Sequence, residues 1–219
     1  MTANLTLYVN LMTVNSLKML LFCNALGIKP NYKHIELHRG EQQSEQFLQL
    51  NPEGKVPVLV EGDFVLNESN AILQYLANKY QSPLWPSDMR AQGEVLKWLF
   101  WQTSYWNAAV GIFGHRRVVL PHWGFEVRQK LSSKEMDQFH LAMSRIDRVL
   151  TSKRALVGND FSIADISLGS YLIFAEEAQI PLEEYINVYR WLDQLREMSW
   201  WQKTRQTLLD ILNEQVHKE

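Results

Sequence analysis

A short segment with two prolines is the first part of the sequence whose residue types suggest binding chemistry. It reads Asn51-Pro52-Glu53-Gly54-Lys55-Val56-Pro57-Val58-Leu59. Pro57 opens an apolar strand pattern, although proline has no N–H to donate to a neighbouring strand. A cis Val56–Pro57 bond costs only about 0.5–1 kcal/mol. Such a bond would leave the main-chain groups of Val56 free to pair with an extended peptide. An ordinary proline at a strand start is the alternative.

A second segment places a carboxylate and a hydroxyl where a strand gives way to a helix. It reads Leu66-Asn67-Glu68-Ser69-Asn70-Ala71-Ile72. Free N–H groups and the dipole at a helix N-terminus attract a carboxylate, and Ser69 adds a hydroxyl donor. Glu68 suits an ammonium group. Together the two residues predict a site for the doubly charged head of an amino acid, and the alternative is a plain helix cap.

The first half of the chain alternates strand and helix patterns, which would position both segments. Residues 5–9 and 34–38 have the period of two that is typical of strands, and a hairpin turned by Gly62 is predicted from 56–60 and 64–66. Helices are predicted over 14–26, stopped by Gly27, and over 69–80. This order predicts a mixed sheet with helices packed on it.

The second half shows helical patterns only. Long amphipathic helices are predicted over 93–113, 134–150 and 188–216. The clearest local signal is Phe161-Ser162-Ile163-Ala164-Asp165-Ile166, a capping box formed by Ser162 and Asp165 with Phe161 and Ile166 as its hydrophobic staple. All eight tryptophans lie at position 85 or later, and Ser82-Pro83-Leu84-Trp85-Pro86 reads as a linker. We therefore divide the chain into residues 1–82, a linker 83–90 and residues 91–219.

Composition excludes several classes of protein. The 219 residues are 46% hydrophobic and 21% charged with a net charge of −2, which argues against disorder and against nucleic acid as the main partner. The single cysteine, Cys23, lies in an apolar run and is interpreted as a small buried hydrophobe. That run, 19–23, is too short for a signal peptide or a membrane span. We expect a cytoplasmic protein without membrane attachment.

The combination of motifs resembles the cytosolic glutathione transferases. The pattern Asn-Pro-x-Gly-x-Val-Pro-x-Leu, then Glu-Ser-x-Ala-Ile, then a linker and Ser-x-x-Asp covers the whole chain. The resemblance implies an α/β thioredoxin-like N-terminal domain that binds glutathione and an all-helical C-terminal domain that shapes the second-substrate site. It also implies a homodimer, with an interface between one subunit's first domain and the other's helical domain.

The resemblance also assigns binding roles. The Val56 main chain, ahead of Pro57, would pair with the cysteinyl part of glutathione, and Glu68 and Ser69 would hold its γ-glutamyl end. Lys55 is expected near the glycyl carboxylate. Gln42 and Gln43 occupy a loop in which some members of the family carry His and Lys, so their role is open.

The resemblance leaves the residue that activates the thiol less settled. Thr13 falls where serine-type members keep their serine, and Thr13-Val14-Asn15 resembles a bacterial branch that places Thr and Asn around the sulfur. A donor beside a helix N-terminus favours thiolate over thiol. Thr13 and Asn15 are our catalytic candidates. Ser16 competes with them as a helix cap, and Tyr8 is the rival because tyrosine-type members carry a phenol on this strand.

Two other groups of residues have types that could bind a metal or line a substrate pocket. His34, Glu36 and His38 alternate like metal ligands, but a solvated strand face explains them, so no metal is expected. Four aromatic residues spread around one predicted helix, of which most are expected in the core and one or two in an apolar substrate pocket: Trp98, Trp101, Tyr105 and Trp106.

The leading prediction is therefore a glutathione transferase that adds the glutathione thiolate to small apolar electrophiles. Glutathione-dependent disulfide reduction is the enzymatic alternative. The second alternative is a non-catalytic protein of the same fold with a binding or stress-regulatory role. The sequence leaves the electrophile open, because the predicted helices of the second half would shape its pocket.

Overall fold

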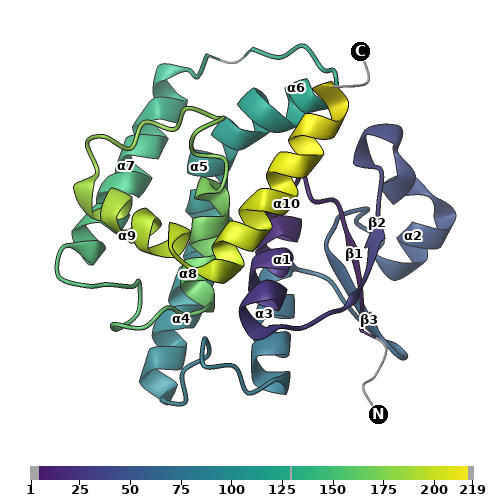
Figure 1. Cartoon of the computed structure of the whole chain (residues 1–219), viewed down its shortest axis with the longest axis horizontal. Helices are drawn as coiled ribbons and strands as arrows, with labels where there is room; N and C mark the ends of the chain where they lie inside the picture. Colours follow the sequence, from purple (N-terminus) through teal and green to yellow (C-terminus); the bar gives the residue numbers. More distant parts are fainter. Residues whose placement is uncertain (1–4, 129, 217–219) are drawn as a thin grey trace.

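The computed structural model describes residues 5–128 and 130–216, which form two parts lying side by side (Figure 1). The first part contains a mixed sheet of β1 (Leu5–Val9), β2 (Asn31–His34), β3 (Val58–Glu61) and β4 (Phe64–Leu66). The strand order is β2-β1-β3-β4, with β1 parallel to β2 and antiparallel to β3. Strands β3 and β4 form the expected hairpin. This is the predicted thioredoxin-like arrangement.

Helix α1 (Val14–Leu26) begins and ends at the predicted signals. Thr13 is its N-cap, and its hydroxyl accepts a hydrogen bond from the Ser16 N–H. Gly27 ends the helix at a φ of 67°, a conformation that a residue without Cβ adopts at little cost. The Ile28 N–H then bonds the Cys23 carbonyl at 2.9 Å, which satisfies one of the last helical acceptors.

The two faces of the sheet have different partners. Leu5, Leu7 and Val9 of β1 belong to the main core, together with α1 and α3 (Ser69–Lys79). On the other face, Phe47 of α2 (Glu45–Leu50) packs with Ile35 and Val58 in a smaller cluster. The alternation of side chains along β1 therefore sends neighbouring residues of this strand to opposite layers.

The strand predicted at 34–38 is wrong in its position. Strand β2 ends at His34, and its partners in β1 run from Thr6↔Asn31 to Val9↔His34. Its four residues are all exposed, because β2 is an edge strand. Residues Leu37–Arg39 form a 3₁₀ turn. The alternation of Ile35 and Leu37 reflects their packing on the small cluster in a loop and a turn.

The helix predicted at 93–113 is longer and irregular. It begins with α4 (Met89–Trp101), capped by Asp88, and continues through α5 (Asn107–Gly114) to α6 (Leu120–His122). Two π-helical turns, Gln102–Trp106 and His115–Val119, join these pieces. Each π turn inserts one extra residue and rotates the following face. The apolar pattern stays close to helical through both turns, so the sequence does not indicate where they occur.

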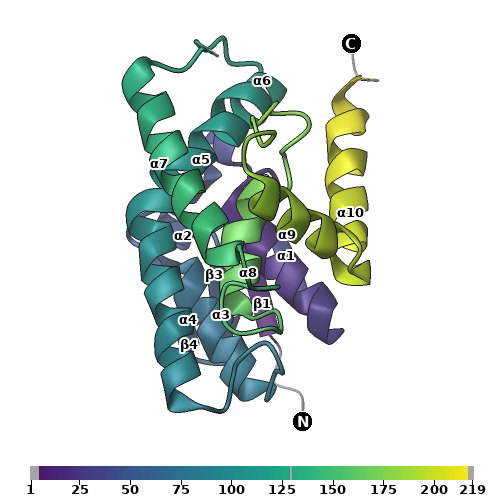
Figure 2. The same cartoon turned by 90° about the vertical axis from the view of Figure 1, so that its left-hand side faces the viewer.

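The remaining helices are α7 (Ser133–Leu150), α8 (Ile163–Gly169), α9 (Ile186–Arg196) and α10 (Ser199–Val216). Helix α7 agrees with the prediction, and the predicted capping box of α8 is confirmed. The single helix predicted at 188–216 is wrong, since the chain turns between α9 and α10. Figure 2 shows α4 and α7 on one side of the molecule and α10 on the other, with α1 and α8 between them.

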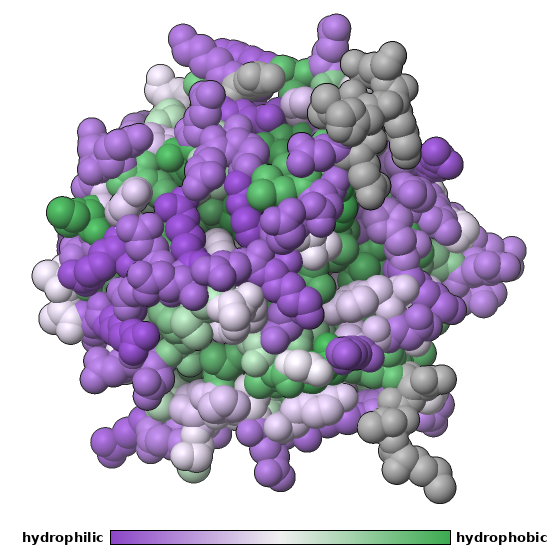
Figure 3. Space-filling model, in the orientation of Figure 1, coloured by the Kyte–Doolittle hydropathy of each residue, from purple (hydrophilic) through white to green (hydrophobic). Residues whose placement is uncertain are grey.

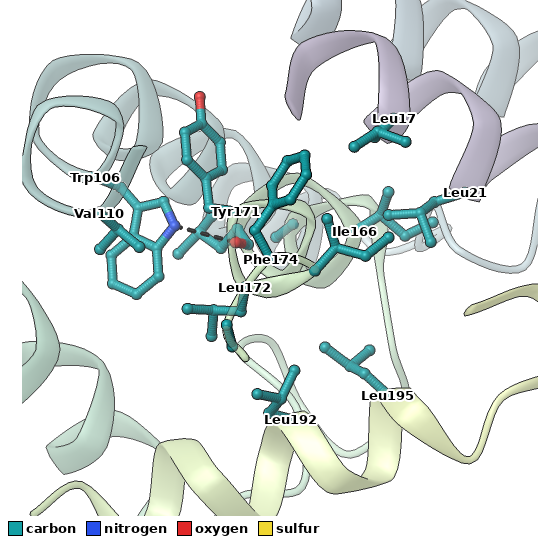
Figure 4. Packing of buried hydrophobic residues seen from close by; sticks show 14 of the residues in the cluster. Leu17, Leu21, Trp106, Val110, Ile166, Tyr171, Leu172, Phe174, Leu192 and Leu195 are labelled. Atoms are coloured by element: carbon teal, nitrogen blue, oxygen red, sulfur yellow. Dashed lines mark hydrogen bonds between the residues drawn. The ribbon is translucent and has the colours of Figure 1, made fainter. Parts of the chain in front are cut away.

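One core joins the two parts. Leu17 and Leu21 of α1 lie opposite Ile166 of α8, while Trp106 donates its indole N–H to the Leu168 carbonyl at 3.0 Å (Figure 4). Burying an apolar side chain of this size stabilises the fold by about 1.5–3 kcal/mol. Helix α1 is thus fixed from both sides, and the residues at its N-terminus have a rigid support.

The surface is mostly polar on the face seen in Figure 1. Figure 3 shows hydrophilic side chains over most of that face, with hydrophobic side chains visible between them. Among the helices of the described ranges, none is both long and apolar enough to cross a membrane.

Candidate active site

The junction of β1 and α1 holds Thr13 in a compact cap. Its hydroxyl has two acceptors within reach, the Asn10 carbonyl and Ser16 Oγ, each at 2.9 Å. Ser16 Oγ also accepts from the Asn10 N–H at 3.1 Å. Ser16 is completely buried, which keeps it from contacting a ligand, whereas Thr13 is half-buried.

Asn15 links this junction to the N-terminus of α3. Its Oδ1 accepts from the Ser69 hydroxyl at 3.2 Å and lies 3.5 Å from the Tyr171 hydroxyl. Because Oδ1 faces these donors, the amide Nδ2 is the group that remains to donate to a ligand. Thr13, Asn15 and Ser69, separated by up to 56 positions in the chain, are thereby brought to one end of the sheet.

The proline segment lies beside them. The Val56–Pro57 bond is cis, the first of the two alternatives considered for this proline, and strand pairing begins one residue later, at Val58 opposite Tyr8. Asn51 secures the segment, since its Nδ2 donates to the Lys55 carbonyl at 2.8 Å and its Oδ1 accepts from Asn67 Nδ2 at 3.1 Å. These bonds place the segment next to the turn that precedes α3.

Glu68 occupies an unusual backbone conformation at the start of α3. Its φ is 63°, a region that non-glycine residues seldom adopt and that costs on the order of 1–3 kcal/mol. Its side chain makes no capping hydrogen bond, so the first N–H groups of α3 are left to other acceptors. The carboxylate is exposed, and Ser69, the next residue, is 8% exposed.

Lys55 extends from the proline segment into solvent. Its ammonium pairs with the Glu53 carboxylate at 3.0 Å. The hydrogen bond and charge of Glu53 raise the pKa of Lys55, and Glu68 adds to this in smaller measure. Gln43 packs on the same segment, because a Cβ at Gly54 would lie 2.5 Å from its Nε2.

A buried lysine that none of the sequence motifs indicated lies directly behind Ser69. Lys18 Nζ donates to Ser69 Oγ at 3.0 Å, to Asn70 Oδ1 at 2.9 Å and to Gln102 Oε1 at 3.2 Å. The residue is completely buried, and this burial lowers its pKa to about 7, against a smaller opposing effect of Glu68. Gln102 reaches the group from the first π turn.

A cleft of about 570 Å³ opens next to Thr13, between the N-terminus of α1 and the helices α5 to α7. Its lining is mainly apolar and comes from both parts of the chain: Met12, Thr13, Val14, Leu37, Asn107, Ala108, Gly111, Ile112, His115, Val119, Trp123, Glu135 and Gln138. The predicted aromatic residues lie elsewhere. Trp98, Trp101 and Trp106 are core residues and Tyr105 is exposed, so Trp123 is the tryptophan of this cleft.

Two ionisable groups border the cleft. Burial and the nearby Arg116 lower the pKa of His115, which makes its imidazole neutral at pH 7. The N–H and hydroxyl of Ser132, with help from Arg116, lower the pKa of Glu135 to about 2. Glu135 is therefore ionised and paired with Arg116, whose Nη2 lies 2.7 Å from Oε1.

Tyr8, the rival for activating the thiol, and the single cysteine lie away from the cleft beside Thr13. The Tyr8 hydroxyl accepts from Lys33 Nζ at 3.3 Å, and its ring packs against Phe47 on the α2 face. Cys23 is buried, as predicted, and burial raises the pKa of its thiol to about 11.

The two histidines considered above as metal ligands lie beside one carboxylate. The Glu36 carboxylate lies 3.3 Å from His38 and 3.6 Å from His34. Within residues 5–128 and 130–216, no three His, Cys, Asp or Glu residues are grouped as metal ligands.

Comparisons with known proteins agree with this geometry. The family model "Glutathione S-transferase, N-terminal domain" matches residues 3–78, and "Glutathione S-transferase, C-terminal domain" matches residues 104–198. Glutathione S-transferase theta-2 of Mus musculus is 31% identical over 97% of this chain and 85% of its own length. Theta-1 of Bos taurus is 28% identical over 98% of this chain and 88% of its own length.

Solved structures have the same architecture. A glutathione S-transferase from Pseudomonas fluorescens is 30% identical with a TM-score of 0.80, covering 90% of this chain and 97% of its own. A glutathione S-transferase-I with bound lactoylglutathione is 26% identical with a TM-score of 0.82, covering 93% and 99%. Two matched domains, homologous sequences over nearly the full length and a shared fold lead to one conclusion: this chain belongs to the glutathione S-transferase family and is a transferase that uses glutathione as co-substrate.

Proposed function

We propose that the enzyme conjugates the glutathione thiolate to small apolar electrophiles held in the cleft beside Thr13. The observation that carries this proposal is the double position of Thr13, which caps α1 and also lines the mainly apolar cleft. A thiolate next to Thr13 would face that cleft directly. The lowered pKa of His115 favours its neutral form, and the charge of Glu135 in the cleft wall is paired with that of Arg116.

Glutathione would bind across the three junctions at this end of the sheet. The main chain of Val56 pairs with the cysteinyl residue, because strand pairing in the protein starts only at Val58. Glu68 holds the ammonium group of the γ-glutamyl residue. Ser69 and the uncapped N-terminus of α3 hold its carboxylate. Lys55, which is exposed near Glu68, reaches toward the glycyl carboxylate.

Thr13 and Asn15 would stabilise the thiolate together. The Asn15 amide Nδ2 would donate to the sulfur, and the N-terminus of α1 would contribute its dipole. The Thr13 proton points to Asn10 or Ser16 without ligand, so a rotation about one side-chain bond has to turn it toward sulfur. The thiol proton leaves to solvent, the sulfur forms a bond to the electrophilic carbon, and the displaced group or the electron-accepting atom takes up the electron pair.

Two assays on the purified protein test this function. Conjugation of glutathione to a panel of uncharged electrophiles and reduction of a glutathione mixed disulfide are run side by side. We expect conjugation to dominate and to fall in Thr13→Val, with Thr13→Ser retaining it. Dominant disulfide reduction would assign the alternative reaction, and no glutathione binding in calorimetry would exclude both.

We also propose a homodimer in the cytoplasm. Large apolar side chains are exposed on both parts of the chain: Phe64 and Val65 of β4, and Met89, Phe100 and Tyr105 of the α4 region. Burying them between one subunit's first domain and the other's helices would remove this surface from water. A reducing compartment suits a free thiol as co-substrate. Light scattering should give twice the 25.7 kDa of one chain, and Phe100→Asp should shift the mass toward one chain.

A further inference from the structure

Lys18 is a charged group that the proposed chemistry does not yet use. It lies in an otherwise apolar stretch of α1, and its side chain is completely buried where α1, α3 and the first π turn meet. A buried ammonium is costly unless hydrogen bonds or an opposite charge compensate for the lost water. Its nearest partners are three oxygens of uncharged side chains, and Glu68 is the carboxylate that acts on it from a distance.

The hydrogen bonds of Lys18 determine where the hydroxyl proton of Ser69 points. A charged ammonium has three hydrogens, and Ser69 Oγ, Asn70 Oδ1 and Gln102 Oε1 accept one each. Ser69 then accepts from Lys18, so its own hydroxyl proton must point elsewhere. The structure directs that proton at Asn15 Oδ1, 3.2 Å away, on the side of the proposed glutathione site. A neutral amine could instead accept the Ser69 proton.

We propose that Lys18 is a positioning residue for glutathione: its buried ammonium keeps the Ser69 hydroxyl proton on the ligand side, where it turns from Asn15 to donate to the γ-glutamyl α-carboxylate, and it places a positive charge behind that carboxylate. The inference rests on the proposed glutathione site. It extends that site inward by one layer, from the ligand through Ser69 to Lys18.

The surroundings make this charge sensitive to a bound anion. Two ionisable residues surround Lys18. Glu68 carries a negative charge at the N-terminus of α3. The ring of Tyr171, in the 3₁₀ turn Ser170–Leu172, has its centre 6.0 Å from Lys18 Nζ. Burial raises the pKa of Tyr171, so this phenol stays neutral. The pKa of Lys18 is about 7, so half the amines are neutral near that pH. A carboxylate bound at Ser69 would raise this pKa, and binding above pH 7 should therefore take up a proton.

Calorimetry with S-methylglutathione tests the proposal, because this probe has no thiol to ionise. Its analogue with a carboxamide in place of the γ-glutamyl α-carboxylate serves as the second ligand. At pH 6.5 the wild type should lose about tenfold or more in affinity on this replacement. In Lys18→Met the same replacement should have an effect roughly fivefold smaller, which is the coupling between Lys18 and the carboxylate. Lys18→Gln repeats the comparison in case the methionine variant folds poorly.

One further measurement, with a control variant, separates positioning from a structural role. Titrations at pH 8 in buffers of different ionisation enthalpy should show proton uptake in the wild type that is absent in both Lys18 variants. Lys33→Met removes one exposed lysine and should behave like the wild type. Equal carboxamide effects in wild type and variants, or no proton uptake by the wild type, would overturn the proposal while leaving glutathione binding intact. No binding of S-methylglutathione by the wild type would overturn the glutathione site as well.

Discussion

Two charged side chains, Asp165 and Lys18, are completely buried, and their surroundings differ in kind. The Asp165 carboxylate receives hydrogen bonds from the N–H groups of Leu156 and Ser162, from the Ser162 hydroxyl and from the Trp191 indole, all at 2.9–3.0 Å. The Lys18 ammonium donates to side-chain oxygens of Ser69, Asn70 and Gln102.

The difference indicates two uses of a buried charge. The partners of Asp165 are mostly main-chain and indole donors that the fold fixes, and they join α8, α9 and the loop before α8. The partners of Lys18 are side chains, of which Ser69 leads to the surface beside Glu68. We infer that Asp165 holds the helical part together, whereas Lys18 is kept for a ligand.

The largest expected effect is on the Asp165 side of the comparison. Asp165→Ala leaves several buried donors without an acceptor, and the free energy of unfolding should fall by about 3 kcal/mol or more. Chemical denaturation measures this. Ser162→Ala removes only the capping hydroxyl and should cost about 1 kcal/mol. If Asp165→Ala folds but binds glutathione more weakly, Asp165 also contributes to binding, and the proposed division of roles between Asp165 and Lys18 is wrong.

Lys18 should make the ligand-free protein less stable at pH 7 than at pH 9, because its charged form is buried. The pKa of Lys18 is lowered from its ordinary 10.5 to about 7, so between these values the unfolded chain binds more protons. Stability therefore rises with pH, by about 2 kcal/mol between pH 7 and pH 9 from this group. Subtracting the unfolding profile of Lys18→Met from that of the wild type isolates the effect. A flat difference curve would mean that Lys18 is not titrating there.

Glu68 and Ser69, which lie between Lys18 and the surface, should affect glutathione binding more than folding. Glu68→Ala and Ser69→Ala should each weaken glutathione binding roughly tenfold or more, since each removes a charge-assisted hydrogen bond. Glu68→Gly provides a matched control, because glycine relieves the positive φ and should stabilise the fold while binding is still lost. Calorimetry and thermal unfolding of the same samples distinguish the two outcomes.

The smallest effect is expected at Thr13, the N-cap of α1. Its hydroxyl borders the cleft, whereas the capping hydroxyl of Ser162 is buried. Thr13→Val should raise the pKa of the bound glutathione thiol by about one unit, equal to about 1.4 kcal/mol. Thr13→Ser should leave it unchanged. Ultraviolet titration of the thiolate follows this pKa. An unchanged value in Thr13→Val, with a raised one in Tyr8→Phe, would assign the role to the phenol.

Much of the site could be predicted because its signals are local. The start of the helix after Thr13, the turn into Ser69 and the box of Ser162 and Asp165 each depend on a few neighbouring residues, whereas the cis bond before Pro57 was one of two alternatives. Backbone sterics and hydrogen bonds between near neighbours are specified by the sequence itself. The motifs were also sufficient to predict the family and the two-part architecture.

Tertiary structure alone decided what surrounds these local features. Lys18 reads as a surface lysine in a helical pattern, and its burial depends on Asn70 and Gln102, 52 and 84 positions away. The π turn that contains Gln102 shifts the helical phase by only one residue, and the apolar pattern of the sequence does not indicate where this happens. Trp123, rather than Trp98 or Trp101, lines the cleft, where its ring stacks with that of His38, 85 positions earlier in the chain. The sequence determined the ends of these elements, whereas long-range packing determined which side chains they bury together.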